Sequence, residues 1–227
     1  MSFALAVGKY EADVKMTPKS MIPTLPPARR RRALSAPAGY SLIEILVVVG
    51  IIAVVSVIAV PMTGNSIRSF RITGDIRTLT NTVSLTKMRA ASTFDQARVY
   101  VDLSTRTYHV ETWQKTGTPA WVTEGGALEL STGVSFGFSG LAAAPPDTQG
   151  TLAQAPPCRT AAGVDIGNTA CVVFNSRGIP VDSSGSPTAL GAVYLTDGSV
   201  VYGVTVSASG LIQSWTSQPS TATWTRQ

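Results

Sequence analysis

Residues 39–61 read GYSLIEILVVVGIIAVVSVIAVP, and this stretch sets the architecture of the chain. Its apolar run from Leu42 to Val60 contains a single charged residue, Glu44. A helix rises about 1.5 Å per residue, so the run roughly matches the ~30 Å hydrocarbon core of a bilayer. In an ordinary secretory signal a small-residue cleavage site follows the apolar run, whereas here the small residues 36–39 precede it. We therefore expect a transmembrane helix.

The segment Gly39-Tyr40-Ser41-Leu42-Ile43-Glu44, followed by this apolar run, resembles the processing signature of type IV pilins and type II secretion pseudopilins. The resemblance implies that a prepilin peptidase cuts between Gly39 and Tyr40 and that Tyr40 becomes N-methylated. The family most often has Phe at the position of Tyr40. The implied partners are the prepilin peptidase, other pseudopilins or minor pilins, and inner-membrane lipid.

Glu44 has two interpretations. A carboxylate within a membrane helix costs about 2.5–3.5 kcal/mol at its centre, so such a residue is a functional candidate with a partner. After cleavage, the new amino group of Tyr40 on a neighbouring subunit could be that partner during filament assembly. Alternatively, Glu44 only stabilises the first turn of a helix through the macrodipole.

The charge of the chain is concentrated at its beginning. Residues 1–38 contain seven Lys and Arg against two acids, which accounts for the whole net charge of +5 and leaves the remainder balanced. The run Arg29, Arg30, Arg31 and Arg32 stands beside the apolar helix, where the positive-inside rule would hold it in the cytoplasm. We expect a single-pass protein of the bacterial inner membrane with a periplasmic head. A twin-arginine export signal is the competing interpretation of the arginine run.

Beyond Pro61 the apolar residues Ile72, Ile76, Leu79 and Val83 recur at helical spacing. We expect one helix from about Ser41 to about Ala91, bent or loosened at Pro61 and near Gly64; two separate helices divided at Pro61 are the alternative. The predicted domains are a cleaved leader at 1–39, a transmembrane half-helix at 40–61, an amphipathic half-helix at 62–93, and a β-rich head at 94–227.

After residue 97 the apolar period changes to two, which predicts a β-hairpin over 97–113 with its turn at 104–106. Further strands are expected at 127–130, 134–138, 171–175, 192–196, 200–206 and 211–215. The predicted fold class is α+β: a long N-terminal helix, with a membrane-embedded first half, packed on one antiparallel β domain as in pilins. Segments 172–180, 192–198 and 204–210 resemble the closing strands of the GspH/FimT group, although Leu211 stands where that group often has arginine.

Cys158 and Cys171 are the two cysteines, and a disulfide between them is expected, with two buried free thiols as the alternative. With His109 as the sole histidine they make a poor zinc site, so we expect no metal and no cofactor. The sequence lacks the common catalytic motifs, which argues against an enzyme.

The function that these features indicate is that of a minor pseudopilin, a structural subunit of the type II secretion pseudopilus. The alternative is a type IV minor pilin that acts in pilus assembly, adhesion or DNA uptake. Nucleic-acid binding is not expected, because it requires clustered Lys and Arg and the chain after the leader is balanced.

Overall fold

The computed structural model describes residues 39–227, apart from the side chains at positions 58, 60–63 and 65. The arginine run at 29–32 and the rest of the predicted leader, except Gly39, lie outside these residues. The chain divides into two units, one ending at Val49 and the other comprising Gly50–Gln227. Helix α1 is a single element of 52 residues, Leu42–Thr93, whose backbone continues through Pro61.

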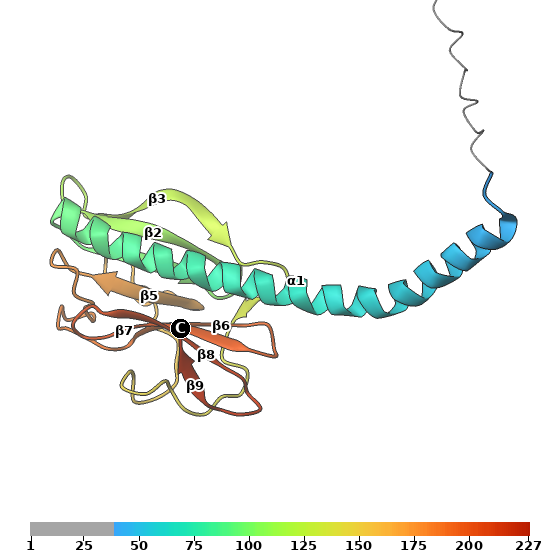
Figure 1. The fold of residues 1–227 in the computed structure, drawn as a ribbon. Coiled ribbons are helices and arrows are strands. Elements are labelled where there is room, and N and C mark those ends of the chain that lie inside the picture. Colours follow the sequence, from blue (N-terminus) through green and yellow to red (C-terminus); the bar gives the residue numbers. More distant parts are fainter. Residues whose placement is uncertain (1–38) are drawn as a thin grey trace, which may run out of the picture. The chain divides into compact units, whose positions relative to one another are not determined.

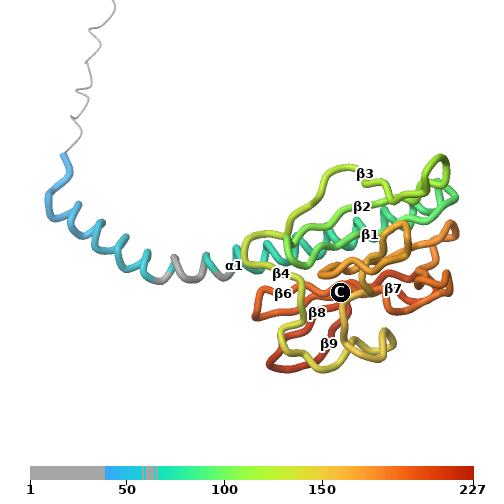
Figure 2. The backbone as a smooth tube through the Cα atoms, turned by 180° about the vertical axis from the view of Figure 1, so that it is seen from behind, coloured from blue at the N-terminus to red at the C-terminus, as the bar shows by residue number. Residues whose placement is uncertain are grey.

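The predicted amphipathic stripe of α1 is confirmed in the second unit. Ile72, Ile76, Leu79 and Val83 are buried, and Ala90 extends the stripe towards the end of the helix. In Figure 1 this part of α1 crosses in front of β2, and in the opposite view of Figure 2 the strands β1 and β2 lie in front of the helix. The second half of α1 therefore covers one face of the first sheet.

The predicted membrane-embedded first half is contradicted. Within the part of the chain that the structure describes, no helix combines the length and the apolar character needed to cross a bilayer. The predicted fold class with a membrane-embedded half-helix is therefore wrong, and so is the predicted single-pass inner-membrane location.

The head consists of two antiparallel sheets, whereas the sequence predicted one antiparallel β domain. The first sheet has the order β3-β2-β1-β5. Its strands are β1 (Ala97–Asp102), β2 (Thr107–Gln114), β3 (Ala120–Glu129) and β5 (Thr169–Phe174). The second sheet has the order β4-β6-β7-β8-β9. Its strands are β4 (Ser135–Phe136), β6 (Gly191–Thr196), β7 (Val201–Val206), β8 (Ile212–Ser217) and β9 (Trp224–Arg226).

The hairpin predicted over 97–113 is confirmed as β1 and β2, and each of the other predicted strands overlaps an observed one. Two strands were missed in whole or in large part. β3 is mostly exposed and interrupted by Gly125-Gly126, and its register with β2 shifts, so the alternating pattern is lost. β9 is a three-residue strand with only one apolar side chain, too short for a pattern.

One hydrophobic core joins the helix to both sheets. It contains Leu79 and Val83 from α1, Val99 from β1, and Val193 and Val204 from the second sheet. Because the two sheets share this core with α1, the head and the second half of the helix form one packed structure. The opposite face of the first sheet points away from α1 and carries polar side chains, among them Arg98, His109 and Glu111.

Candidate functional site

The predicted processing motif stands at the start of α1. Gly39 and Tyr40 precede the helix, Tyr40 is 80% exposed, and Glu44 is the acidic residue of the first turn. An exposed Gly39–Tyr40 bond is accessible to a peptidase. The position of Glu44 is compatible with both interpretations of its role, assembly and stabilisation of the helix terminus.

The first turns of α1 carry exposed apolar side chains at consecutive positions rather than along one stripe. Consecutive residues from Ile45 to Val49 are all exposed, and so are Ile51, Ile52, Val54, Val55 and Val57. Consecutive positions on a helix point in directions about 100° apart, so this segment is apolar around its circumference. A helix with this character is normally covered on all sides. We call Leu42–Val57 the exposed apolar segment.

Polar contacts hold the second half of α1 to the head. Arg68 Nε lies 3.1 Å from Asp197 Oδ2, and Lys87 Nζ donates to the carbonyl of Gly210 at 2.8 Å. Asp75 accepts two hydrogen bonds from Ser131, one from its backbone N–H and one from its hydroxyl, both at 2.9 Å. These contacts, together with the core, fix the helix on the head.

Asp197 is the most constrained of these acids, since its side chain is only 4% exposed. Its Oδ1 accepts hydrogen bonds from the backbone N–H groups of Ser199 and Val200 and from the Ser199 hydroxyl. Burial acts to raise the pKa of Asp197, but these hydrogen bonds and the charge of Arg68 outweigh it and lower the pKa below its ordinary value.

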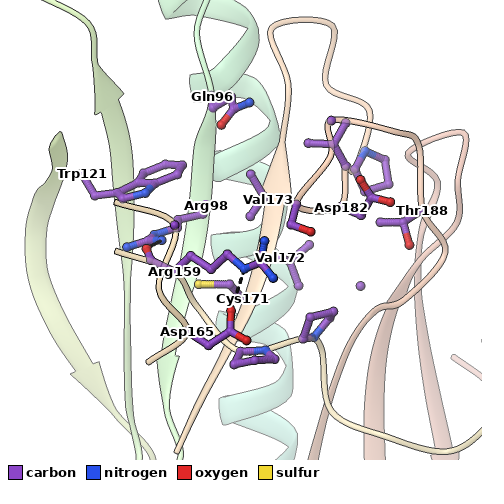
Figure 3. A pocket seen from close by; sticks show the side chains of 18 of the residues that line it. Gln96, Arg98, Trp121, Arg159, Asp165, Cys171, Val172, Val173, Asp182 and Thr188 are labelled. Carbon is purple, nitrogen blue, oxygen red and sulfur yellow. Dashed lines mark hydrogen bonds and ion pairs between the residues drawn. The ribbon is translucent and has the colours of Figure 1, made fainter. Parts of the chain in front are cut away.

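A cleft of about 490 Å³ opens on the face of the first sheet that points away from α1 (Figure 3). Trp121, Arg159 and Asp165 lie along one side, Asp182 and Thr188 along the other, and Val172 and Val173 between them. One wall is residues 156–165, which we call the strap. The strap leads into β5 after a short turn.

The disulfide Cys158–Cys171 ties the strap to β5, and Cys171 lines the cleft. Further hydrogen bonds hold the same segment: the Cys171 N–H donates to the Pro156 carbonyl at 2.8 Å, and the Cys158 N–H donates to Thr169 Oγ1 at 2.9 Å. The strap, which forms one wall of the cleft, is therefore cross-linked to β5.

A buried ion pair lies under the strap. Arg98 Nε donates to Glu111 Oε2 at 2.6 Å, with the two side chains 4% and 11% exposed. Arg98 Nη1 donates to the Arg159 carbonyl at 2.6 Å, and the guanidinium lies 4.0 Å from the centre of the Trp121 ring. Burial lowers the pKa of Arg98 below its ordinary value, and the charge of Glu111 opposes this effect.

His109 and Tyr100 lie on the same face of the first sheet as Arg98 and Glu111. His109 Nε2 lies 3.2 Å from Glu111 Oε1, and the His109 ring stacks on Tyr100 with the ring centres 4.9 Å apart. His109 is thus part of a polar network on the sheet. Among the described residues no group of three or more acidic, histidine or cysteine side chains is placed to hold a metal ion.

Sequence reasoning did not single out Arg98, Glu111, Trp113 or Trp121. A signal existed, because a hairpin centred between residues 104 and 105 places Arg98 opposite Glu111 and Tyr100 opposite His109, as the register shows. The pairing of Trp113 with Trp121 had no such signal, because β3 itself was missed in that region.

No family model, curated protein or solved structure matches this chain. The resemblance to pilins therefore rests on the motif at 39–44 and on the pattern of the closing strands.

Proposed function

We propose that the chain is a minor pseudopilin, a structural subunit of the type II secretion pseudopilus that assembles through its N-terminal helix. The observation that carries the proposal is the exposed apolar segment Leu42–Val57, which has one charge, Glu44, and exposed apolar side chains on every side. Helices of the same kind from other subunits would bury this surface and gain about 25 cal/mol for each Å² removed from water.

The motif at 39–44 supports the same proposal. Cleavage after Gly39 by a prepilin peptidase would leave Tyr40 as the first residue, with its amino group N-methylated and positively charged. Inside a bundle of apolar helices this charge requires a counter-charge, and Glu44 of a neighbouring subunit would supply it.

The alternative, a type IV minor pilin, shares the helix and the motif and differs in its partners. The balanced charge after the leader, and Leu211 in place of an arginine, favour a structural role over DNA binding.

A photo-reactive amino acid at Val48 of the full chain tests the proposal in cells. We expect cross-links to other subunits whose sequences carry the same Gly, aromatic and Glu motif before an apolar helix. The same photo-reactive residue at Ser220, an exposed residue of the head, is the control and should not give these products.

In the chain that carries the photo-reactive residue at position 48, Glu44→Gln keeps the shape of the side chain and removes its charge. We expect the cross-links to be lost, whereas Glu129→Gln, an exposed acid of the head, should leave them intact. Cross-links unchanged by Glu44→Gln would reduce Glu44 to a helix-terminus residue. Cross-links formed only with proteins that lack the motif would contradict the proposed function. If the cross-linked partners do carry the motif, their identity would distinguish a secretion pseudopilus from a type IV pilus.

A further inference from the structure

We propose that the cleft beside the disulfide binds an uncharged sugar ring. This inference goes beyond the proposed function and does not depend on it. The cleft, at about 490 Å³, has the size of a small-molecule site, and its lining combines aromatic and aliphatic side chains with eight polar or charged ones.

The two arginines of the cleft are already paired with acids of the protein. Arg98 pairs with Glu111 at 2.6 Å, and Arg159 pairs with Asp165 at 2.6 Å. The Asp182 carboxylate accepts hydrogen bonds from both the N–H and the hydroxyl of Ser184 and from the N–H of Ser186. An anionic ligand would therefore meet no arginine in the cleft without an acidic partner, which favours an uncharged ligand over an anion.

The pair Arg159–Asp165 has the chemistry that recognises hydroxyl groups. Arg159 uses Nε to contact Asp165 Oδ1, and its guanidinium has further N–H donors on Nη1 and Nη2. Asp165 accepts hydrogen bonds through two oxygens, so a donor group and an acceptor group stand side by side. Both side chains are about half exposed, at 45% and 55%, and remain accessible to a ligand. Neighbouring hydroxyls of a sugar ring can donate to the carboxylate and accept from the guanidinium.

The indoles supply the apolar half of the site. Trp113 and Trp121 both line the cleft, with ring centres 5.1 Å apart and planes inclined at 63°. A sugar ring has hydroxyls at its edge and C–H groups on its faces, and such a face packs well on an aromatic surface. One face of Trp121 is engaged by Arg98, which fixes this indole in place.

The site is held in place before any ligand arrives. The strap is tied by the disulfide Cys158–Cys171, and the Arg159 backbone is held by the buried Arg98. Groups that are already fixed lose little conformational freedom on binding, which favours affinity.

Saturation-transfer NMR on the full chain tests the inference. The neutral sugar probes are glucose, N-acetylglucosamine and cellobiose, and the charged sugar probe is glucuronate. An acetylated tetraproline peptide is the probe that is not a sugar. We expect transfer to at least one neutral sugar. Arg159→Ala and Asp165→Asn should each weaken its binding by about tenfold, because the first removes donors to the hydroxyls and the second replaces a charged acceptor oxygen by an amide donor.

Arg106→Ala is the matched control, because Arg106 also forms a half-exposed ion pair, with Glu129, outside the cleft. It should bind the sugar like the wild type, and near-UV circular dichroism checks that each variant is folded. Transfer to none of the three neutral sugars would overturn the inference, as would undiminished binding by folded Arg159→Ala. Transfer to the peptide alone would also overturn it and would assign the cleft to protein recognition.

Discussion

At the scale of single residues, Asp197 links the helix to the second sheet through Arg68. Asp197→Asn should lower the free energy of unfolding by about 1 kcal/mol at pH 7, since it removes a nearly buried charge with a partner. The pKa of Asp197 is lowered in the folded state, so the wild type loses this stability as the pH falls from about 4 through the folded pKa.

Urea unfolding of the wild type and Asp197→Asn at pH 7 and pH 3 measures this effect. The difference in stability should narrow at the lower pH. Asp147→Asn, which changes an exposed acid, is the control. A difference of equal size at both pH values would show that the charge of Asp197 does not contribute.

A second expectation at this scale concerns the buried pair. Glu111→Gln leaves Arg98 buried without its counter-charge and should cost about 3 kcal/mol of stability. Glu129→Gln breaks an exposed pair, with Arg106, whose atoms are 3.7 Å apart, and should cost less than about 1 kcal/mol. Denaturant unfolding of the two variants compares them directly, and equal losses would refute the structural importance of Arg98–Glu111.

At the scale of elements, the strap depends on the disulfide, whose cysteines are separated by 13 positions. Replacing both cysteines by alanine should lower the free energy of unfolding by about 3 kcal/mol, because the bond restricts the unfolded chain. Thiol labelling of the denatured, unreduced wild type should find no free cysteine. Two reactive thiols, or equal denaturation midpoints for the wild type and the double variant, would contradict this account.

The elements also show what the sequence can predict. Apolar residues that recur at helical spacing, such as Ile72, Ile76 and Leu79 in α1, were predicted correctly, because burial of one helix face produces that spacing in the sequence. The Gly-interrupted edge strand β3 leaves none, and the division into two sheets depends on pairings between distant residues, such as Ala97 with Phe174. For the site, the cleft requires the strap, β5 and β3 to come together, and no local pattern encodes that arrangement.

At the scale of the whole molecule, one region of the sequence supported two separate expectations, of which the structure tests only the membrane-spanning one. Hydropathy over Leu42–Val60 predicted a transmembrane helix, and the described helix does not meet that requirement. The expectation of assembly through the same segment is a separate one, because it depends on exposed apolar side chains, which the structure shows, and on processing at Gly39.

The mass of the N-terminal peptide of the mature protein, isolated from the cells that produce it, shows whether the chain is processed like a pilin subunit. We expect a chain that begins at Tyr40 and carries one added methyl group on its amino nitrogen. Gly39→Val should block this cleavage and leave the arginine run at 29–32 attached. A mature wild-type chain that retains residues 1–39, or that begins after the apolar helix, would contradict assignment to the pseudopilins.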